Sequence, residues 1–385
     1  MDQLTVILDV TRLLRRSIKG KTLTGIDRVT MAYVRHYEHR AYAWIRWAGR
    51  SFILSRGQSE ALFAWLLKPA SKWVLRFIVL KGMVLKCFEQ IPPHTFLLNT
   101  GHIGLGQSDY ERMIRKLGVK PIFFVHDIIP IIYPEYCSPG EDSRHVTKMN
   151  YVLSFGAGVI TNSQATLNDL TDYARQTHQM MPPAVVALLA SGIPLLPPEA
   201  PLMDKPYFVI LGTIEPRKNH VMVFQLWRRL VQHFGEKTPH LVVIGQRGWE
   251  CENAVDMLER CQMLKGYVTE ISRCNDADLV TYLHHSQALL MPSFVEGYGL
   301  PVVEALALGV PVIASDLPVF KEIACDIIDY LNPLDGMGWG DLIMEYARPD
   351  SSRRASQMKR LQQFKRPDWD VHFIQVDAFL GCIKH

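Results

Sequence analysis

Eight short apolar runs, separated by stretches with helical periodicity, constrain the fold of this chain more than any other feature. Each run is rich in Val, Ile, Leu or Phe and is bounded by turn-forming residues. The runs lie at 7–10, 95–100, 121–127, 158–163, 207–213, 241–246, 288–293 and 311–316. Runs of this length and composition are typical of parallel strands that helices cover on both faces. Their alternation with helical stretches predicts an α/β fold with doubly wound parallel sheets.

The length of 385 residues and one proline-rich segment predict two domains. The segment from Ser191 to Pro206 contains five prolines and no helical or strand pattern, as is typical of an extended linker. We therefore expect an N-terminal domain at 1–195 and a C-terminal domain at 206–365. The final segment, 366–385, has apolar residues at helical spacing. It predicts a C-terminal helix that packs either on its own domain or back on the N-terminal domain.

Composition and charge narrow the class of protein. The net charge of +4 is too small to indicate a protein that binds nucleic acid. The seven cysteines form no Cys-x-x-Cys pair, so neither a disulfide framework nor a zinc site is indicated. The N-terminus lacks the basic region of a secretory signal, and no run approaches the roughly 18 apolar residues of a transmembrane helix. These features predict a cytoplasmic protein with no nucleic-acid partner.

The segment Phe294–Glu304, FVEGYGLPVVE, carries the strongest functional signal. It follows an apolar run, contains two glycines and then enters a predicted helix. Gly297 and Gly299 let the backbone approach a ligand, and the first amides of the helix favour anionic oxygens, so a diphosphate fits this turn. Glu296 in the turn and Glu304, two turns into the helix, offer acceptors to sugar and ribose hydroxyls. The alternative is a solvated helix start with two surface carboxylates.

A second signal, GTIEPRKNH, begins at Gly212, directly after the first strand of the C-terminal domain. Ligands of open α/β folds collect at the carboxyl ends of the strands, where this loop is expected. Arg217 offers a bidentate fork and Lys218 a point charge, so together they suit a diphosphate. The alternative is a solvated basic turn in which Asn219 caps the next helix.

Together the two motifs resemble those of the family 4 retaining glycosyltransferases, and the resemblance spans almost the whole chain. It implies the GT-B fold, in which two Rossmann-like domains face each other. Glu296 and Glu304 match the family's Glu-x7-Glu motif, and Arg217 and Lys218 match its basic pair. The resemblance assigns Glu296 to the transferred sugar, Glu304 to the ribose and the basic pair to the diphosphate. Donor contacts are also expected along the backbone, at Gly212, Gly297, Tyr298, Gly299 and Leu300.

The N-terminal segment TGIDRV at 24–29 also resembles the family. Gly25 is then expected to face the donor phosphates. The alternative is a plain loop glycine, followed by Asp27 as a helix cap, because one glycine specifies little.

Two further N-terminal segments match the acceptor side of the family. In the first, His126 and Asp127 end a predicted strand, and His126 is expected to hydrogen-bond the transferred sugar. An isolated histidine is more often a structural residue, which is the alternative. In the second segment, Asn162 and Ser163 are expected to line the acceptor side.

Asp-x-Asp pairs, which hold a divalent ion on the diphosphate in other glycosyltransferases, occur twice. Asp276 and Asp278 begin a predicted helix, where first-turn carboxylates are expected, and Asp368 and Asp370 lie near the tail. Neither pair ends a buried strand. Since the basic pair can balance the phosphates, we expect no required metal and no cofactor other than the nucleotide sugar co-substrate.

The segment 61–88 combines aromatic and aliphatic residues with basic ones and has no acidic residue. Its basic residues are Lys68, Lys72, Arg76, Lys81 and Lys86. Such a segment can lie in the headgroup region of an anionic membrane, where a lipid-linked acceptor would be presented. The alternative is a pair of core helices with snorkelling lysines, interrupted at Pro69.

These expectations describe a retaining, metal-independent hexosyltransferase. Its donor would be GDP-mannose or a UDP-sugar, and its acceptor a growing surface polysaccharide, lipid-linked or free, at the cytosolic face of a membrane. The alternatives are a nucleotide-sugar epimerase or hydrolase with the same fold, and a non-catalytic scaffold that binds nucleotide sugars. The sequence leaves open the base, the sugar, the linkage and the oligomeric state.

Overall fold

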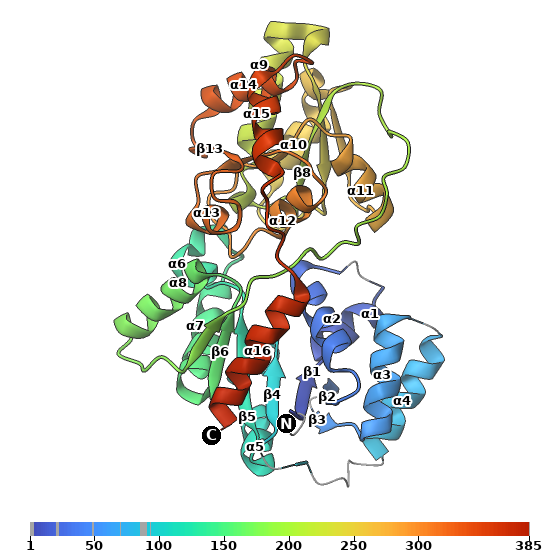
Figure 1. The fold of residues 1–385 in the computed structure, drawn as a ribbon, viewed down its shortest axis with the longest axis vertical. Coiled ribbons are helices and arrows are strands. Elements are labelled where there is room, and N and C mark those ends of the chain that lie inside the picture. Colours follow the sequence, from blue (N-terminus) through green and yellow to red (C-terminus); the bar gives the residue numbers. More distant parts are fainter. Residues whose placement is uncertain are drawn as a thin grey trace. The chain divides into compact units, whose positions relative to one another are not determined.

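The chain forms two α/β units, each built on a mainly parallel sheet (Figure 1). The computed structural model describes residues 4–20, 23–47, 50–69, 71–84, 91–92 and 94–384. The N-terminal unit comprises Met1–Ile128, Ser143–Leu189 and Asp368–His385, and the C-terminal unit comprises Ile129–Asp142 and Ala190–Pro367. Two segments therefore depart from a simple division of the chain at the linker, one at 129–142 and one at 368–385.

The N-terminal unit has a seven-stranded sheet in the order β3-β2-β1-β4-β5-β6-β7. All neighbouring strands are parallel except β2 and β3. The strands are β1 (Val6–Asp9), β2 (Ala41–Trp47), β3 (Arg50–Ile53), β4 (Phe96–Asn99), β5 (Lys120–Val125), β6 (Gly158–Thr161) and β7 (Ala184–Val186). The helices are α1 (Thr11–Ile18), α2 (Gly25–Tyr37), α3 (Arg56–Leu67), α4 (Lys72–Val84), α5 (Ser108–Leu117), α7 (Glu141–Phe155), α8 (Gln164–Gln176) and α16 (Trp369–Lys384).

The C-terminal unit has a six-stranded parallel sheet in the order β10-β9-β8-β11-β12-β13. Its strands are β8 (Tyr207–Leu211), β9 (His240–Ile244), β10 (Val268–Ile271), β11 (Leu289–Met291), β12 (Val312–Ser315) and β13 (Asp329–Leu331). Its helices are α6 (Ile129–Ile132), α9 (His220–Phe234), α10 (Glu252–Arg260), α11 (Asp276–His284), α12 (Leu300–Ala307), α13 (Pro318–Ala324), α14 (Gly336–Tyr346) and α15 (Ser352–Leu361).

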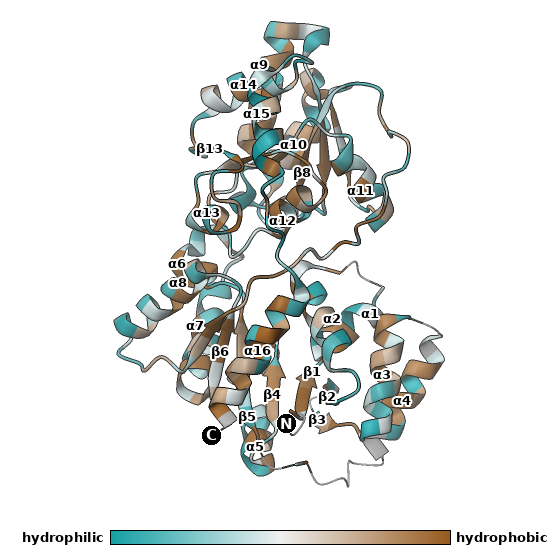
Figure 2. Ribbon diagram, in the orientation of Figure 1, coloured by the Kyte–Doolittle hydropathy of each residue, from teal (hydrophilic) through white to brown (hydrophobic). Residues whose placement is uncertain are grey.

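Burial of the strands explains why the apolar runs form these sheets. Figure 2 shows hydrophobic residues concentrated in the strands, whereas the helices have mixed faces. The eight predicted strands are all present, as β1, β4, β5, β6, β8, β9, β11 and β12. The α/β fold class with two parallel sheets is therefore confirmed. The order of the sheet strands places the C-terminal ends of β8 and β11 side by side, because these strands are neighbours.

Helix α16 packs against α2 within the N-terminal unit. Phe373 is buried, and the Tyr33 hydroxyl lies 3.0 Å from His372 Nε2. Asp377 accepts hydrogen bonds from the Tyr37 hydroxyl at 2.5 Å and from Arg40 Nη2 at 2.8 Å. The sequence left open whether this segment packs on its own domain or back on the N-terminal domain. These contacts show that it packs within the N-terminal unit.

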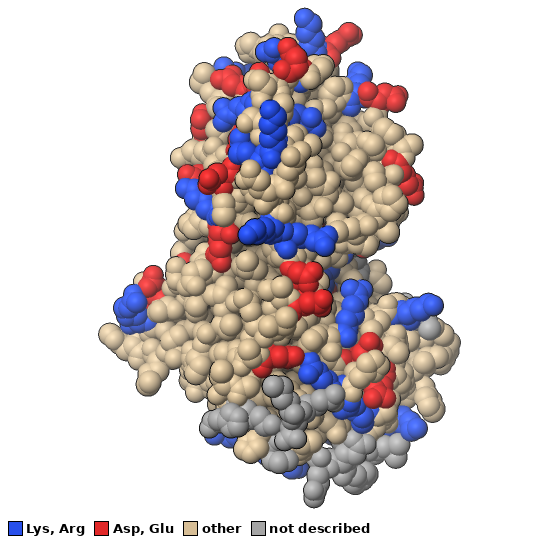
Figure 3. All heavy atoms as spheres, in the orientation of Figure 1, with Lys and Arg blue, Asp and Glu red and all other residues tan. Residues whose placement is uncertain are grey.

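Charged side chains of both signs are spread over the face shown in Figure 3, and Lys and Arg gather over α15. Two of the α15 arginines serve structural ion pairs, since Arg353 and Arg360 both contact Asp329, at 2.8 and 2.7 Å. Among the described residues, no helix combines the length and the hydropathy needed to cross a bilayer.

The segment 61–88 forms parts of α3 and α4, with Pro69 between them, and its residues 70 and 85–88 lie outside the described part of the chain. Helix α3 buries Leu62, Phe63, Trp65 and Leu66. Helix α4 buries Leu75, Ile78 and Val79 but exposes Trp73 and Phe77. The described part of the segment therefore contributes side chains to the core and also exposes large aromatic side chains on α4.

Candidate functional site

The basic motif lies in the loop that follows β8. Gly212 has a φ of +139°, which favours glycine, and residues Pro216–Lys218 form a 3-10 turn that leads into α9. The alternative of a solvated basic turn does not hold, since Lys218 is buried. Asn219 occupies the N-cap position of α9, but its side chain accepts no capping hydrogen bond, and its Nδ2 donates to the Pro333 carbonyl at 2.9 Å.

The acidic motif lies in the loop that follows β11. Gly299 has a φ of +111° and immediately precedes α12, which starts at Leu300 with Pro301 in its first turn. A Cβ atom at Gly299 would lie 2.5 Å from the Phe320 ring, so the backbone and the packing both require glycine here. Glu304 is the fifth residue of this helix and is buried. It therefore lies in the second turn, nearer the helix start than expected, and it is no solvated surface carboxylate.

The two loops meet through a buried ion-pair network. Arg217 Nη1 lies 2.7 Å from Glu296 Oε2, and Lys218 Nζ pairs with Glu296 Oε1. The Ser293 hydroxyl donates to the same Oε1 at 2.7 Å. Both cations of the basic motif are thus directed at the carboxylate of the acidic motif, 78 and 79 residues further along the chain.

Opposing forces set the protonation states in this network. Burial opposes ionisation of Glu296, but the nearby Lys218 and Arg217 charges outweigh it and hold the pKa of the Glu296 carboxyl at about 2. Burial also lowers the pKa of Lys218, while Glu296 counteracts this effect. The network therefore contains an ionised carboxylate near neutral pH.

Glu215 is a further member that the sequence motifs did not single out. Its Oε1 lies 2.6 Å from Arg217 Nε, and its side chain is buried. Burial raises the pKa of Glu215, and the charges of Arg217 and Lys218 lower it. The sequence could have indicated Glu215 through its position in the 212–220 segment, two residues before Arg217.

The remaining predicted donor residues of the acidic motif directly follow Glu296 in the sequence. Gly297 and Tyr298 lie in the loop between Glu296 and α12, and Tyr298 is buried. Leu300 is the first residue of α12. The loop therefore carries the backbone of Gly297, Tyr298 and Gly299 directly from Glu296 to the amino end of the helix.

His126 follows β5 in the N-terminal unit and is buried. Its Nε2 lies 2.8 Å from the Thr100 carbonyl, which can only accept, so this nitrogen carries the proton and Nδ1 remains an acceptor in the neutral ring. Burial lowers the pKa of His126 to about 4. The ring also lies 5.6 Å from the ring of His102, which the sequence did not indicate.

The other residues predicted for the acceptor side have structural partners. Asn162 Nδ2 donates to the His126 carbonyl at 2.9 Å, and Ser163 caps α8 by accepting from the Thr166 amide at 3.0 Å. The Asp127 carbonyl lies 3.2 Å from His145 Nε2. The Asn162 contact joins the ends of β5 and β6, and the His145 contact joins the end of β5 to α7.

Gly25 is the first residue of α2. The Thr24 amide donates to Asp27 Oδ2 at 2.8 Å, forming a capping box. The buried Asp27 also pairs with Arg12 at 3.1 Å and Arg16 at 2.7 Å. Thr24 is therefore the N-cap of α2, Asp27 completes the capping box from the third helical position, and Gly25 lies exposed in the first turn instead of in a loop.

Both Asp-x-Asp pairs lie at helix starts, the first at α11 and the second at α16. Asp276 begins α11, and Asn275 caps this helix by accepting from the Asp278 amide at 2.8 Å. Asp368 accepts from the Asp370 amide at 2.6 Å. In the described part of the chain, no group of three or more His, Cys, Asp or Glu residues is arranged to hold a metal ion.

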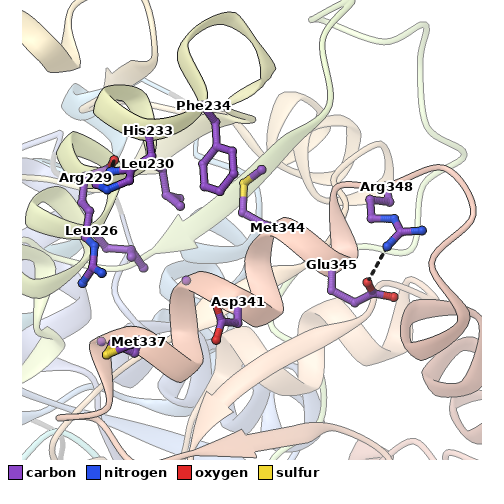
Figure 4. A pocket seen from close by; sticks show the side chains of 12 residues that line it. Leu226, Arg229, Leu230, His233, Phe234, Met337, Asp341, Met344, Glu345 and Arg348 are labelled. Carbon is purple, nitrogen blue, oxygen red and sulfur yellow. Dashed lines mark hydrogen bonds and ion pairs between the residues drawn. The ribbon is translucent and has the colours of Figure 1, made fainter.

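A pocket of about 480 Å³ lies elsewhere in the C-terminal unit, between α9 and α14 (Figure 4). Leu226, Leu230 and Phe234 line it from α9, and Met337 and Met344 line it from α14. It contains none of the predicted site residues, so it is separate from the ion-pair network.

Residues 196–329 match the family model described as glycosyl transferases group 1. This region contains both loops of the ion-pair network. The chain is 27% identical over 227 residues to the serotype-specific mannosyltransferase WbdA of Escherichia coli, covering 55% of this chain and 28% of that protein. It is also 27% identical over 253 residues to the O-antigen chain mannosyltransferase B of Escherichia coli, covering 64% of this chain and 66% of that protein.

Solved structures resemble the whole chain. The crystal structure of Anabaena Alr3699/HepE in complex with UDP and glucose has a TM-score of 0.70 at 14% identity, covering 99% of this chain and 100% of that chain. An α,α-trehalose-phosphate synthase (UDP-forming) from Burkholderia vietnamiensis has a TM-score of 0.61 at 12% identity, covering 99% and 100%. Together with the two parallel sheets, these neighbours confirm the GT-B fold that the motifs implied.

Proposed function

We propose that this protein is a glycosyltransferase that moves a hexose from a nucleotide diphosphate sugar to a growing glycan, with retention at the anomeric carbon and without a required metal. The observation that carries the proposal is the convergence of Arg217, Lys218 and Glu296 at the loop leading into α12. The family match over 196–329 supports the reaction class.

The chemistry follows from the charges in the loops. Departure of the nucleoside diphosphate places negative charge on its phosphate oxygens, and Arg217, Lys218 and the Leu300 amide at the start of α12 would stabilise that charge most in the transition state. Glu296 would accept hydrogen bonds from sugar hydroxyls, and Glu304 from the ribose. The sugar becomes oxocarbenium-like, and the incoming hydroxyl attacks from the face of the leaving group. This mechanism requires no covalent nucleophile.

The donor is proposed from the names of similar proteins. Two relatives are named as mannosyltransferases, which favours GDP-mannose, whereas the neighbour bound to UDP and glucose favours a UDP-sugar. The acceptor is proposed to be an O-antigen-like surface polysaccharide. The N-terminal residues Gly25, His126 and Asp127 keep the donor and acceptor roles that the resemblance gives them, with His126 Nδ1 as an acceptor for a sugar hydroxyl.

The acceptor is proposed to be lipid-linked because the exposed aromatic and basic side chains of α4 would suit a membrane surface. Trp73 and Phe77 are 75% and 68% exposed, and Leu80 is exposed beside them. Arg76 stacks over the Trp73 ring at 5.2 Å, and Lys81 is exposed on the same helix. Exposed aromatic side chains among cations suit the headgroup region of an anionic leaflet. The protein is accordingly proposed to act at the cytosolic face of a membrane.

The test of the reaction begins with a thermal-shift screen against UDP, GDP and their sugars. Glycans made with the best donor are then analysed by mass spectrometry. Lys218→Ala and Glu296→Ala are each expected to abolish transfer while circular dichroism shows an intact fold. Lys321→Ala, which removes an exposed lysine of the same unit, is the matched control. Near-normal turnover by either site variant refutes the proposed site.

The same assay separates the alternatives. Release of free sugar or of an epimer indicates a hydrolase or epimerase, and donor binding without any turnover indicates a scaffold. The product's anomeric configuration, read by nuclear magnetic resonance, tests retention, and turnover in the presence of EDTA tests the expected independence from metal.

A further inference from the structure

The ion-pair network has internal partners for both of the cations that the donor is expected to use. Glu215, Arg217, Lys218 and Glu296 carry two positive and two negative charges, and all four side chains are mostly buried. A diphosphate entering this site meets cations that are already paired. Donor binding must therefore exchange one set of anionic partners for another.

The two carboxylates hold the cations in different ways. Glu215 contacts Arg217 at Nε, the inner nitrogen of the guanidinium, whereas Glu296 contacts Nη1 at its outer end. Glu296 also pairs with Lys218, so it is the partner that both cations share. Removing Glu296 would take away the carboxylate partner of Arg217 Nη1 and of the Lys218 ammonium together. Nη1 would keep its contact with the Val295 carbonyl at 3.3 Å, and Glu215 would still hold the guanidinium at Nε.

The backbone gives the two carboxylates different freedom to move. Glu215 directly precedes the 3-10 turn, and its carbonyl accepts a hydrogen bond from the Lys218 amide at 3.1 Å, so its backbone is fixed to the segment that carries both cations. Glu296 instead lies in the glycine-containing loop before α12, on a different strand connection. Glu296 is the member that can change partner without unmaking the turn that carries the cations.

We propose that Glu215 is a positioning residue that keeps Arg217 aimed at the donor diphosphate, and that Glu296 occupies the place of the diphosphate until the donor displaces it. The proposal rests on the proposed function, in which Glu296 then accepts hydrogen bonds from the sugar. When the sugar has been transferred, Glu296 loses those donors and competes for Lys218 and Arg217 again. This competition weakens binding of the nucleoside diphosphate product relative to the sugar-bearing donor.

Two variants with the same change in charge test the proposal. Glu215→Gln and Glu296→Gln each change the sum of charges in the network from zero to +1, so a purely electrostatic effect would strengthen binding of a diphosphate equally in both. The proposal instead expects opposite signs. By isothermal titration calorimetry with UDP and GDP, Glu296→Gln should bind about tenfold more tightly and Glu215→Gln about tenfold more weakly than the wild type.

The nucleotide sugar provides a second readout. In Glu296→Gln, the dissociation constant of the nucleoside diphosphate divided by that of the nucleotide sugar should fall. The variant loses the carboxylate that competes with the diphosphate and also loses the carboxylate that binds the sugar. In Glu215→Gln, both ligands should weaken equally, since both use Arg217. Glu215→Asp keeps the charge but shortens the reach by one carbon, so it reports on position if Glu215→Gln does not fold; Glu296→Asp serves the same purpose at the other carboxylate.

The outcomes are distinguishable. Binding of UDP or GDP by the wild type, with both Gln variants shifted in the same direction, overturns this inference and leaves the proposed function standing. Absence of binding of any nucleoside diphosphate or nucleotide sugar by the wild type overturns the proposed function and this inference with it. Tighter binding by Glu296→Gln together with weaker binding by Glu215→Gln supports both, and any other pattern in a wild type that binds overturns this inference.

Discussion

Asp377 on α16 should contribute about 2 kcal/mol to the stability of the N-terminal unit. Burial opposes ionisation of Asp377, but hydrogen bonds from His36, Tyr37 and Arg40 outweigh it and hold the pKa of the carboxyl at about 2, below its ordinary value of 3.8. A difference of roughly 2 pKa units corresponds to roughly 2.5 kcal/mol. Asp377→Asn should therefore lower the free energy of unfolding by about 2 kcal/mol at pH 7, because an amide cannot replace the charged acceptor.

The effect should depend on pH in a defined direction. A carboxyl with a depressed pKa in the folded state stabilises fully above the unfolded pKa of 3.8, and this stabilisation is lost as pH falls through about 2. The difference between wild type and Asp377→Asn should thus be full at pH 7 and shrink by roughly 1 kcal/mol at pH 3.

Urea denaturation followed by tryptophan fluorescence and circular dichroism measures this difference. The control is Asp341→Asn, which changes an exposed aspartate on α14 of the other unit and should leave the midpoint unchanged. A difference below about 0.5 kcal/mol at pH 7, within the range of an ordinary surface substitution, refutes the reasoning. So does a difference that stays constant down to pH 3.

Three further predictions concern the site and its surroundings. Gly299→Ala should lower the free energy of unfolding by more than about 1 kcal/mol, measured in urea, because φ is +111° and the new Cβ would meet the Phe320 ring. The double variant Trp73→Ser with Phe77→Ser should lose most of its binding to vesicles that contain phosphatidylglycerol, measured by flotation, while transfer to a soluble acceptor persists. His126→Gln should remove a pH-dependent loss of stability. The folded pKa of His126, about 4, lies below the unfolded value of 6.5, so protonation below pH 6.5 favours the unfolded state. Between pH 7 and pH 5, the free energy of unfolding, measured in urea, should therefore fall by roughly 2 kcal/mol more in the wild type than in the variant.

Each of these predictions has a result that contradicts it, and the vesicle assay also has a control variant. A wild-type urea midpoint for Gly299→Ala contradicts the strain argument. For the vesicle assay, Met180→Ser removes an exposed apolar side chain elsewhere in the N-terminal unit and should bind as the wild type does. Unchanged flotation of the double variant contradicts a membrane role for α4. Parallel pH profiles of wild type and His126→Gln show that His126 is not kept neutral by burial.

The strands that the sequence missed show where periodicity stops being informative. Strands β7 and β10 lie at sheet edges and are only partly buried, so they lack the continuous apolar run of a central strand. Strand β2 is buried, but Arg46 interrupts its apolar pattern, and this arginine is accommodated by a 3.0 Å ion pair with Asp109 that no local signal announces. Tertiary contacts, rather than local preference, complete both sheets.

The sequence by itself determined the central strands other than β2, the glycine turns and the identity of the charged residues at the strand ends, because these depend on local backbone geometry and on hydrophobic burial. Only the tertiary structure decided which charges meet. Arg217 and Glu296 lie 79 residues apart and come together because β8 and β11 are neighbours in the sheet. The pairing of Glu215 with Arg217 and the packing of α16 on α2 depend likewise on side-chain directions and on contacts between distant segments, which spacing along the chain does not specify.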